Sequence, residues 1–174
     1  MCIRDRGYTP KEVELARIAA YMHDIGNVVN RHDHALSGAT MAFRILDKMG
    51  MEPADVAAVI TAIGHHDDST AFPVNAVAAA LILADKTDVR RSRVRNKDMA
   101  TFDIHDRVNY AVERSEVSLD RDSKTFTLSL SINTQVCAVM DYFEIFLQRM
   151  LLCRRAAEAL SLKFRLEING QVLL

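Results

Sequence analysis

Residues 9–26 read TPKEVELARIAAYMHDIG, and this stretch decides how the N-terminal part of the chain folds. Thr9 and Glu12 have the spacing of a capping box, around a proline that suits the first helical position. Apolar residues then recur at helical spacing. We therefore predict a mostly apolar helix that ends near the final glycine, with His23 and Asp24 in its last turn.

Further segments with the same helical period follow this one. Each combines apolar residues three or four positions apart with a cap or a helix breaker, such as Gly50 or Pro53, at its boundary. The pattern predicts helices over residues 34–49, 53–66, 75–85 and 104–114.

The pattern changes after residue 115. Alternating apolar residues on both sides of a polar turn predict a β-hairpin over residues 117–132. A long amphipathic helix at 135–160 and a closing strand at 163–168 are predicted next. The apolar stripe of this last helix suits the core or a homodimer contact. We expect a mainly α fold with a small β-β-α-β appendage.

Composition excludes several classes of protein. With 174 residues and a formal charge of −1, the chain has no overall attraction for nucleic acid or an anionic membrane. Three cysteines without metal-type spacing argue against a disulfide framework, which favours a cytoplasmic protein. No apolar run is long enough for a membrane span, and no signal peptide is evident. We interpret residues 1–8 as either a cloning or assembly scar or a disordered tail.

The histidines show an unusual pattern. Four of the six are followed directly by aspartate, whereas chance placement gives about half of one such pair. Five of the six lie between His23 and His66. Imidazole and carboxylate together suit manganese, iron(II) and zinc, which activate water for hydrolysis. We therefore expect a metal site in this part of the chain.

Asp85 closes an almost wholly apolar run at residues 77–84. A carboxylate there is costly to bury unless a cation or several donors meet it, and the helix dipole disfavours an anion at a C-terminal end. We favour a metal ligand over a residue turned to water.

These residues resemble the HD superfamily of metal-dependent phosphohydrolases. The family's His-Asp pair is matched by His23 and Asp24, and its distal acid by Asp85. In the subset that binds two ions, two additional histidines hold the second ion, and His34 and His66 match them. The resemblance implies an HD-like helical bundle over residues 9–115, with residues 116–174 packed on it.

The chain departs from the family pattern at one point. The family's first metal-binding histidine lies upstream of the pair, and no histidine precedes His23. We interpret this as an N-terminal truncation, so that one metal site lacks a ligand.

Groups near these residues suggest how a substrate would be handled. Asp67 and Asp68 follow His66 and are candidates for a general base, for orienting that histidine, or for simple solvation of the loop. Six cations lie within residues 86–97, and guanidinium suits phosphate oxygens. We single out Lys86, Arg90 and Arg91 as candidate phosphate ligands; a surface patch or ion-pair network is the alternative.

Other His-Asp motifs have structural interpretations. His32-Asp33 suits a solvated turn, with Asp33 a candidate helix cap. His65 and the pair His105-Asp106 are also left outside the ligand set.

The resemblance implies a phosphohydrolase that acts on a nucleotide or small phosphate ester through a metal-activated hydroxide. One or two divalent ions (Mn, Fe, Zn or Mg) would be bound: one by His23, Asp24 and Asp85, and a second by His34 and His66 with Asp24 shared. The alternative is a non-catalytic HD-like module that binds a nucleotide or a protein partner. We expect neither a membrane nor a nucleic-acid partner.

Overall fold

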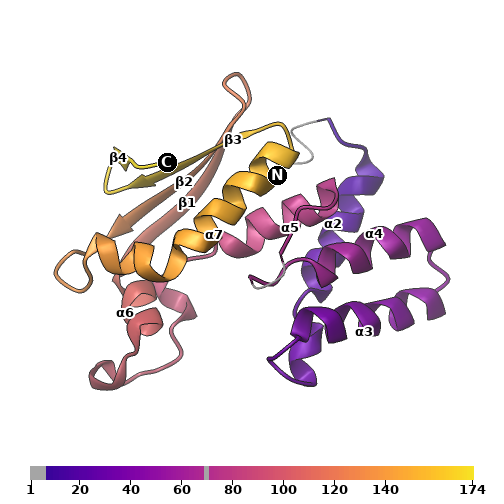
Figure 1. The fold of residues 1–174 in the computed structure, drawn as a ribbon, viewed down its shortest axis with the longest axis horizontal. Coiled ribbons are helices and arrows are strands. Elements are labelled where there is room, and N and C mark those ends of the chain that lie inside the picture. Colours follow the sequence, from indigo (N-terminus) through magenta and orange to yellow (C-terminus); the bar gives the residue numbers. More distant parts are fainter. Residues whose placement is uncertain (1–6, 69–70) are drawn as a thin grey trace. The chain divides into compact units, whose positions relative to one another are not determined.

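The computed structural model describes residues 7–68 and 71–174, which form two compact units (Figure 1). The first comprises the described residues up to Asp85 together with Arg155–Ser161, and the second comprises Lys86–Arg154 and Leu162–Leu174. The division follows Asp85, whereas the sequence analysis placed a boundary after residue 115. Six residues of the expected leader lie outside the described part of the chain.

The first unit is helical. Its first helix begins as the sequence predicts: the Thr9 hydroxyl accepts from Glu12 N at 3.2 Å, and Thr9 N donates to Glu12 Oε2 at 2.8 Å. The elements of this unit are α2 (Pro10–Met22), the 3₁₀ helix η1 (Ile25–Val28), α3 (His34–Lys48), α4 (Pro53–Gly64) and α5 (Ala76–Lys86), whose last residue falls in the second unit.

An apolar core joins these helices. Helices α3 and α4 lie side by side, and α2 packs against α4 (Figure 1). Lys11 of α2 forms an ion pair with Asp55 of α4 at 2.9 Å. The buried cluster draws on every α-helix of the unit: Leu15, Ala19, Met22, Ala42, Leu46, Val56, Val59, Ala62, Ile63, Val77, Ala78 and Leu81.

The second unit contains a four-stranded sheet with the strand order β1-β2-β3-β4. Strand β2 pairs antiparallel with β1 and parallel with β3, and α7 makes the connection between β2 and β3. The elements are η2 (Arg91–Arg93), η3 (Met99–Thr101), α6 (Ile104–Ala111), β1 (Val112–Asp120), β2 (Thr125–Ile132), α7 (Val139–Ala159), β3 (Lys163–Ile168) and β4 (Gln171–Val172).

The hairpin between β1 and β2 is fixed by its turn. Asp120 Oδ1 accepts from the backbone of Asp122 at 2.9 Å and of Ser123 at 3.1 Å. A hydrogen bond with the Ser123 side chain lowers the pKa of the Asp120 carboxyl most, and the backbone bonds from Ser123 and Asp122 lower it further. Lys124 closes the turn with a φ of 53°, a left-handed conformation, before Thr125 pairs with Asp120.

The mainly α prediction is confirmed, with differences at element ends. The helix predicted to reach residue 114 ends at Ala111, because the chain enters β1 at Val112. The long helix begins at Val139 and not at residue 135. Strand β4, which follows a turn at Asn169 and Gly170, had no counterpart in the sequence analysis.

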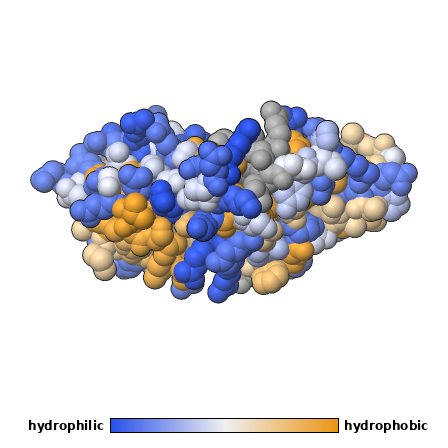
Figure 2. Space-filling model, turned by 90° about the horizontal axis from the view of Figure 1, so that it is seen from above, coloured by the Kyte–Doolittle hydropathy of each residue, from blue (hydrophilic) through white to orange (hydrophobic). Residues whose placement is uncertain are grey.

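No helix in the described part of the chain combines the length and apolar character needed to cross a membrane. Hydrophilic residues dominate the surface seen in Figure 2, but hydrophobic residues also gather there in patches. In the first unit the most exposed large apolar residues are Tyr21 and Val28, at 93% and 78%. Exposed apolar residues of this kind are normal in globular proteins.

Candidate metal centre

The first His-Asp pair lies where α2 ends. Met22 is the last residue of the helix, His23 is its C-cap, and Asp24 precedes η1. His23 Nδ1 lies 2.7 Å from the carbonyl oxygen of Ala20. A carbonyl oxygen can only accept a hydrogen bond, so in the neutral ring Nδ1 carries the proton and Nε2 the lone pair. The pair therefore offers one nitrogen and a carboxylate just beyond the helix end.

A close contact between two glycines brings η1 against α3. A Cβ on Gly26 would lie 2.0 Å from the carbonyl oxygen of His34 and 2.6 Å from Gly38 N. A Cβ on Gly38 would lie 3.3 Å from Gly26 N. At Gly26 only a residue without a side chain allows this approach, whereas a Cβ on Gly38 would make a tight contact. The contact thereby places His34 beside the end of α2.

The histidines His34 and His66 are buried and held in one orientation. His34 Nδ1 donates to the carbonyl of Arg31 at 3.1 Å, and His66 Nδ1 donates to the carbonyl of Ile63 at 2.6 Å. Their exposed fractions are 3% and 1%. In each neutral ring the lone pair is therefore on Nε2.

The two Nε2 atoms face each other at a distance that suits either a shared proton or a bound cation. His34 Nε2 and His66 Nε2 are 3.2 Å apart, and Asp24 Oδ1 lies 3.3 Å from the former and 3.9 Å from the latter. With both Nδ1 atoms protonated, neither neutral ring can donate a hydrogen bond to the other, and two lone pairs at this distance repel. A cation between them converts the repulsion into attraction.

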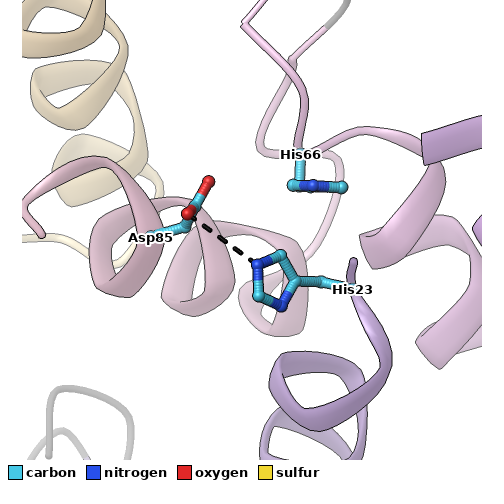
Figure 3. A group of neighbouring side chains, drawn as sticks. All are labelled: His23, His66 and Asp85. Carbon is cyan, nitrogen blue, oxygen red and sulfur yellow. Dashed lines mark ion pairs between the residues drawn. The ribbon is translucent and has the colours of Figure 1, made fainter. Parts of the chain in front are cut away.

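Asp85 completes a second cluster around His23. Figure 3 shows the side chains of His23, His66 and Asp85 gathered from three separate parts of the first unit. His23 Nε2 lies 3.8 Å from Asp85 Oδ1. The Asp85 side chain is 18% exposed, so it is not turned fully to water. Its placement agrees with the cost argument made from the apolar run before it.

Asp24 lies between the two clusters. Its Oδ1 is on the His34 side, and its Oδ2 lies 3.6 Å from His23 Nε2. The ligand atoms of His23, His66 and Asp85 lie within 4.8 Å of one another, as do those of Asp24, His34 and His66. His66 is thus common to both groups, although its single Nε2 lone pair can serve only one ion. The carboxylate, with two oxygens, is the group able to link both.

The donor set fits a divalent ion. The five predicted ligands supply three imidazole nitrogens and two carboxylates, a combination that suits Mn, Fe(II) and Zn. Metal–ligand bonds to these atoms are about 2.0–2.2 Å long, so ligand atoms around one ion lie roughly 3–4 Å apart. The distances between the side chains are of this order. The five residues are thus brought together; their role as ligands stays a prediction.

Asp67, which directly follows His66, lies at the edge of the cluster. Asp67 Oδ1 lies 3.9 Å from His34 Nε2, and the Asp67 side chain is 31% exposed. It therefore borders the cluster and reaches solvent. Asp68 is the next residue of the loop, and its catalytic role stays a prediction.

The predicted phosphate ligands belong to the second unit. Lys86 is 5% exposed, and Arg90 pairs with Asp88 at 2.8 Å. Arg91 donates through Nε to the carbonyl of Tyr110 at 2.6 Å, and its guanidinium stacks on that ring at 4.6 Å. These contacts give Arg91 a structural role, and its binding of phosphate stays a prediction.

The remaining histidines are not part of the two groups described above. His32 Nδ1 lies 2.7 Å from its neighbour Asp33, and both side chains are mostly exposed. Asp33 occupies the N-cap position of α3, but its side chain makes no capping hydrogen bond and its φ is 56°. His65 Nδ1 contacts the carbonyl of Thr61 at 2.9 Å, and His105 lies near Phe146.

Two residues at the site were missed by the sequence analysis. Gly26 permits the close packing described above, and the only signal was its place directly after His23-Asp24-Ile25. Arg31 lies 4.0 Å from Asp24 Oδ1 through its Nη1 atom. A lone arginine in a polar linker carries no sequence signal of such a contact.

Comparison with known proteins yields one match. The HD domain family model matches residues 2–145, which is most of the chain. No curated protein and no solved structure matches the chain significantly.

Proposed function

Because the chain belongs to the HD domain family, we propose that it is a metal-dependent phosphohydrolase acting on a nucleotide or a small phosphate ester. The family generally contains metal-dependent hydrolases and binds divalent metals. The observation that carries the proposal is the pair of Nε2 atoms of His34 and His66, 3.2 Å apart beside the Asp24 carboxylate. Around a cation, both Nε2 lone pairs and the Asp24 carboxylate would be satisfied together, whereas two neutral rings with protonated Nδ1 atoms leave these lone pairs facing each other.

Two ions would be held, each by residues of the first unit. His23, Asp24 and Asp85 would hold one, and His34, His66 and the other oxygen of Asp24 would hold the second. Divalent ions bound there would polarise the phosphate and make water a stronger nucleophile at neutral pH. The three Nδ1 hydrogen bonds to backbone carbonyls would keep the imidazoles aligned in advance.

Asp67 would act as the proton acceptor in this scheme. Attack by water forms a new P–O bond, breaks the bond to the leaving group and releases a proton to the Asp67 carboxylate. The leaving oxygen takes a proton from solvent. Because the Asp67 side chain is partly exposed, it would return the proton to bulk water. Asp68 is the alternative candidate for this role. Lys86, Arg90 and Arg91 remain proposed phosphate ligands.

The proposal is tested by hydrolysis assays on protein stripped with chelator and reloaded with manganese. We expect the reloaded wild type to hydrolyse p-nitrophenyl phosphate or a nucleotide, and His34→Gln to lower kcat/KM at least about 100-fold, since loss of a ligand removes metal or misplaces it.

A matched control lies two residues away. His32→Gln changes an exposed histidine with its own aspartate neighbour, and it should retain wild-type activity. If reloaded wild type binds metal but hydrolyses none of a panel of nucleotides and phosphate esters, the chain is a non-catalytic binding module and the proposal fails.

A further inference from the structure

Arg31 lies at the edge of the cluster, in the loop between η1 and α3. Its carbonyl oxygen accepts the Nδ1 hydrogen bond of His34 at 3.1 Å. Its side chain extends toward Asp24, with Nη1 4.0 Å from Asp24 Oδ1 and 3.3 Å from Asn27 Oδ1. The backbone of this residue therefore orients one candidate ligand while its guanidinium borders another.

The contact with Asp24 is too weak to explain the guanidinium's position as a structural ion pair. The two side chains are 73% and 51% exposed, and 4.0 Å is long for a charge-assisted hydrogen bond. Exposed pairs of this kind contribute little to stability because water screens them. The guanidinium therefore keeps most of its donors directed to solvent beside the cluster.

Charge decides what such a side chain can bind. The carboxylates of Asp24, Asp67 and Asp85 make the cluster acidic, so a phosphate would be repelled from it without metal. Divalent ions would neutralise these carboxylates and weaken the attraction of Asp24 for Arg31. An anion held by the ions would then meet a guanidinium whose planar donors suit two phosphate oxygens.

The two candidate arginines of the second unit are held by shorter contacts than the Arg31–Asp24 contact. Arg90 pairs with Asp88 at 2.8 Å, and Arg91 donates to the carbonyl of Tyr110 at 2.6 Å. In each, the short contact through Nε fixes the orientation of the guanidinium and leaves only its other donors for a phosphate oxygen. Arg31 gives up only its contacts with Asn27 and Asp24, the latter at 4.0 Å.

We infer that Arg31 is a phosphate-binding residue of the metal centre, and this inference rests on the proposed function. Its guanidinium contacts non-bridging oxygens of the phosphate once the ions are bound. It follows that phosphate affinity depends on both manganese and Arg31, whereas manganese affinity does not depend on the Arg31 side chain.

The test is calorimetric titration of inorganic phosphate into manganese-loaded protein. Arg31→Gln should weaken phosphate binding about 10- to 100-fold, the usual effect of losing hydrogen bonds to a charged group. Arg31→Lys should recover part of the affinity, because an ammonium supplies charge without paired donors. Manganese titration should give the same affinity for wild type and both variants within about 2-fold.

Arg17→Gln is the matched control. Arg17 is also an exposed arginine of the first unit, and it pairs with Glu14 at 3.3 Å on α2. This variant should bind phosphate as the wild type does. The KM for p-nitrophenyl phosphate should rise in Arg31→Gln and stay unchanged in Arg17→Gln.

The outcomes separate this inference from the proposed function. If wild type hydrolyses esters and Arg31→Gln binds phosphate with wild-type affinity, the role of Arg31 is wrong and the proposed function stands. If Arg31→Gln loses manganese together with phosphate, the residue acts through His34, and the inference is overturned. If loaded wild type neither binds phosphate nor hydrolyses esters, both fail.

Discussion

At position 26 the backbone lies so close to α3 that a Cβ would meet the His34 carbonyl oxygen at 2.0 Å. That oxygen belongs to the backbone at the first residue of α3, so it can move only if the helix end moves. The glycine therefore sets the distance between Asp24 and His34. Gly26 would therefore affect a bound metal through the positions of Asp24 and His34.

Gly26→Ala should both destabilise the fold and weaken metal binding. Overpacking of this kind costs about 1–3 kcal/mol, and displacement of His34 should lower manganese affinity at least about 10-fold. Chemical denaturation and manganese titration measure the two effects.

Gly64→Ala supplies the comparison. Its Cβ would lie 3.7 Å from the Ala39 Cβ, an ordinary contact, and alanine favours a helix. Stability should stay within about 1 kcal/mol of the wild type. Equal manganese affinity in Gly26→Ala and wild type would show that the glycine contact does not position His34.

The candidate ligands could be predicted from sequence because their chemistry is concentrated there. An excess of His-Asp pairs and a carboxylate after an apolar run both mark positions where polar groups are costly without a partner. Arg31 could not be predicted, because its importance comes from a 4.0 Å contact that only the folded loop creates. The αL conformation of Asp33 was missed for the same reason.

At the scale of elements, starts were predicted better than ends. The capping box of α2 and the prolines at its start and at that of α4 are local signals, and both helices begin where expected. The end of α6 depends on pairing of Val112 with Ile132, a contact between distant residues. Periodicity in a short window cannot reveal such pairing, so that helix was drawn too long.

Helix α7 carries a buried tyrosine with a consequence for alkaline stability. Tyr142 is 0% exposed, and its hydroxyl donates to Met150 Sδ of the same helix at 3.2 Å. Burial, reinforced by Cys153 and opposed by Arg149, raises the pKa of the phenol well above its usual value. The folded state therefore holds the Tyr142 proton at a pH where the unfolded chain releases it.

Stability should fall as pH rises above the unfolded tyrosine value near 10. Above that pH the unfolded state binds fewer protons, and each further unit costs about 1.4 kcal/mol until the folded pKa is reached. Urea unfolding at about pH 9 and about pH 11 measures the loss. Tyr142→Phe should lose less stability over this pH interval, although its free energy of unfolding at the lower pH is smaller than that of the wild type. An identical loss in both proteins would show that the buried phenol does not couple to folding.

At the scale of the whole molecule, the residues with metal-binding chemistry gather in the first unit. All five predicted ligands, as well as Asp67 and Arg31, belong to it, while the second unit contributes the sheet and most of α7. The HD family match covers residues 2–145 and so extends into both units. A homodimer stays a prediction, with the apolar stripe of α7 as the candidate for its contact; Met140 and Leu147 of this helix are exposed.

The metal content of the purified chain tests the central claim most directly. Protein stripped with chelator, reloaded with manganese and desalted should retain between about one and two ions per chain. Asp24→Asn should retain far less, because that carboxylate faces both clusters, whereas Asp33→Asn, at the exposed His32-Asp33 pair, should match the wild type. Wild-type retention below about 0.2 ions per chain would contradict the account.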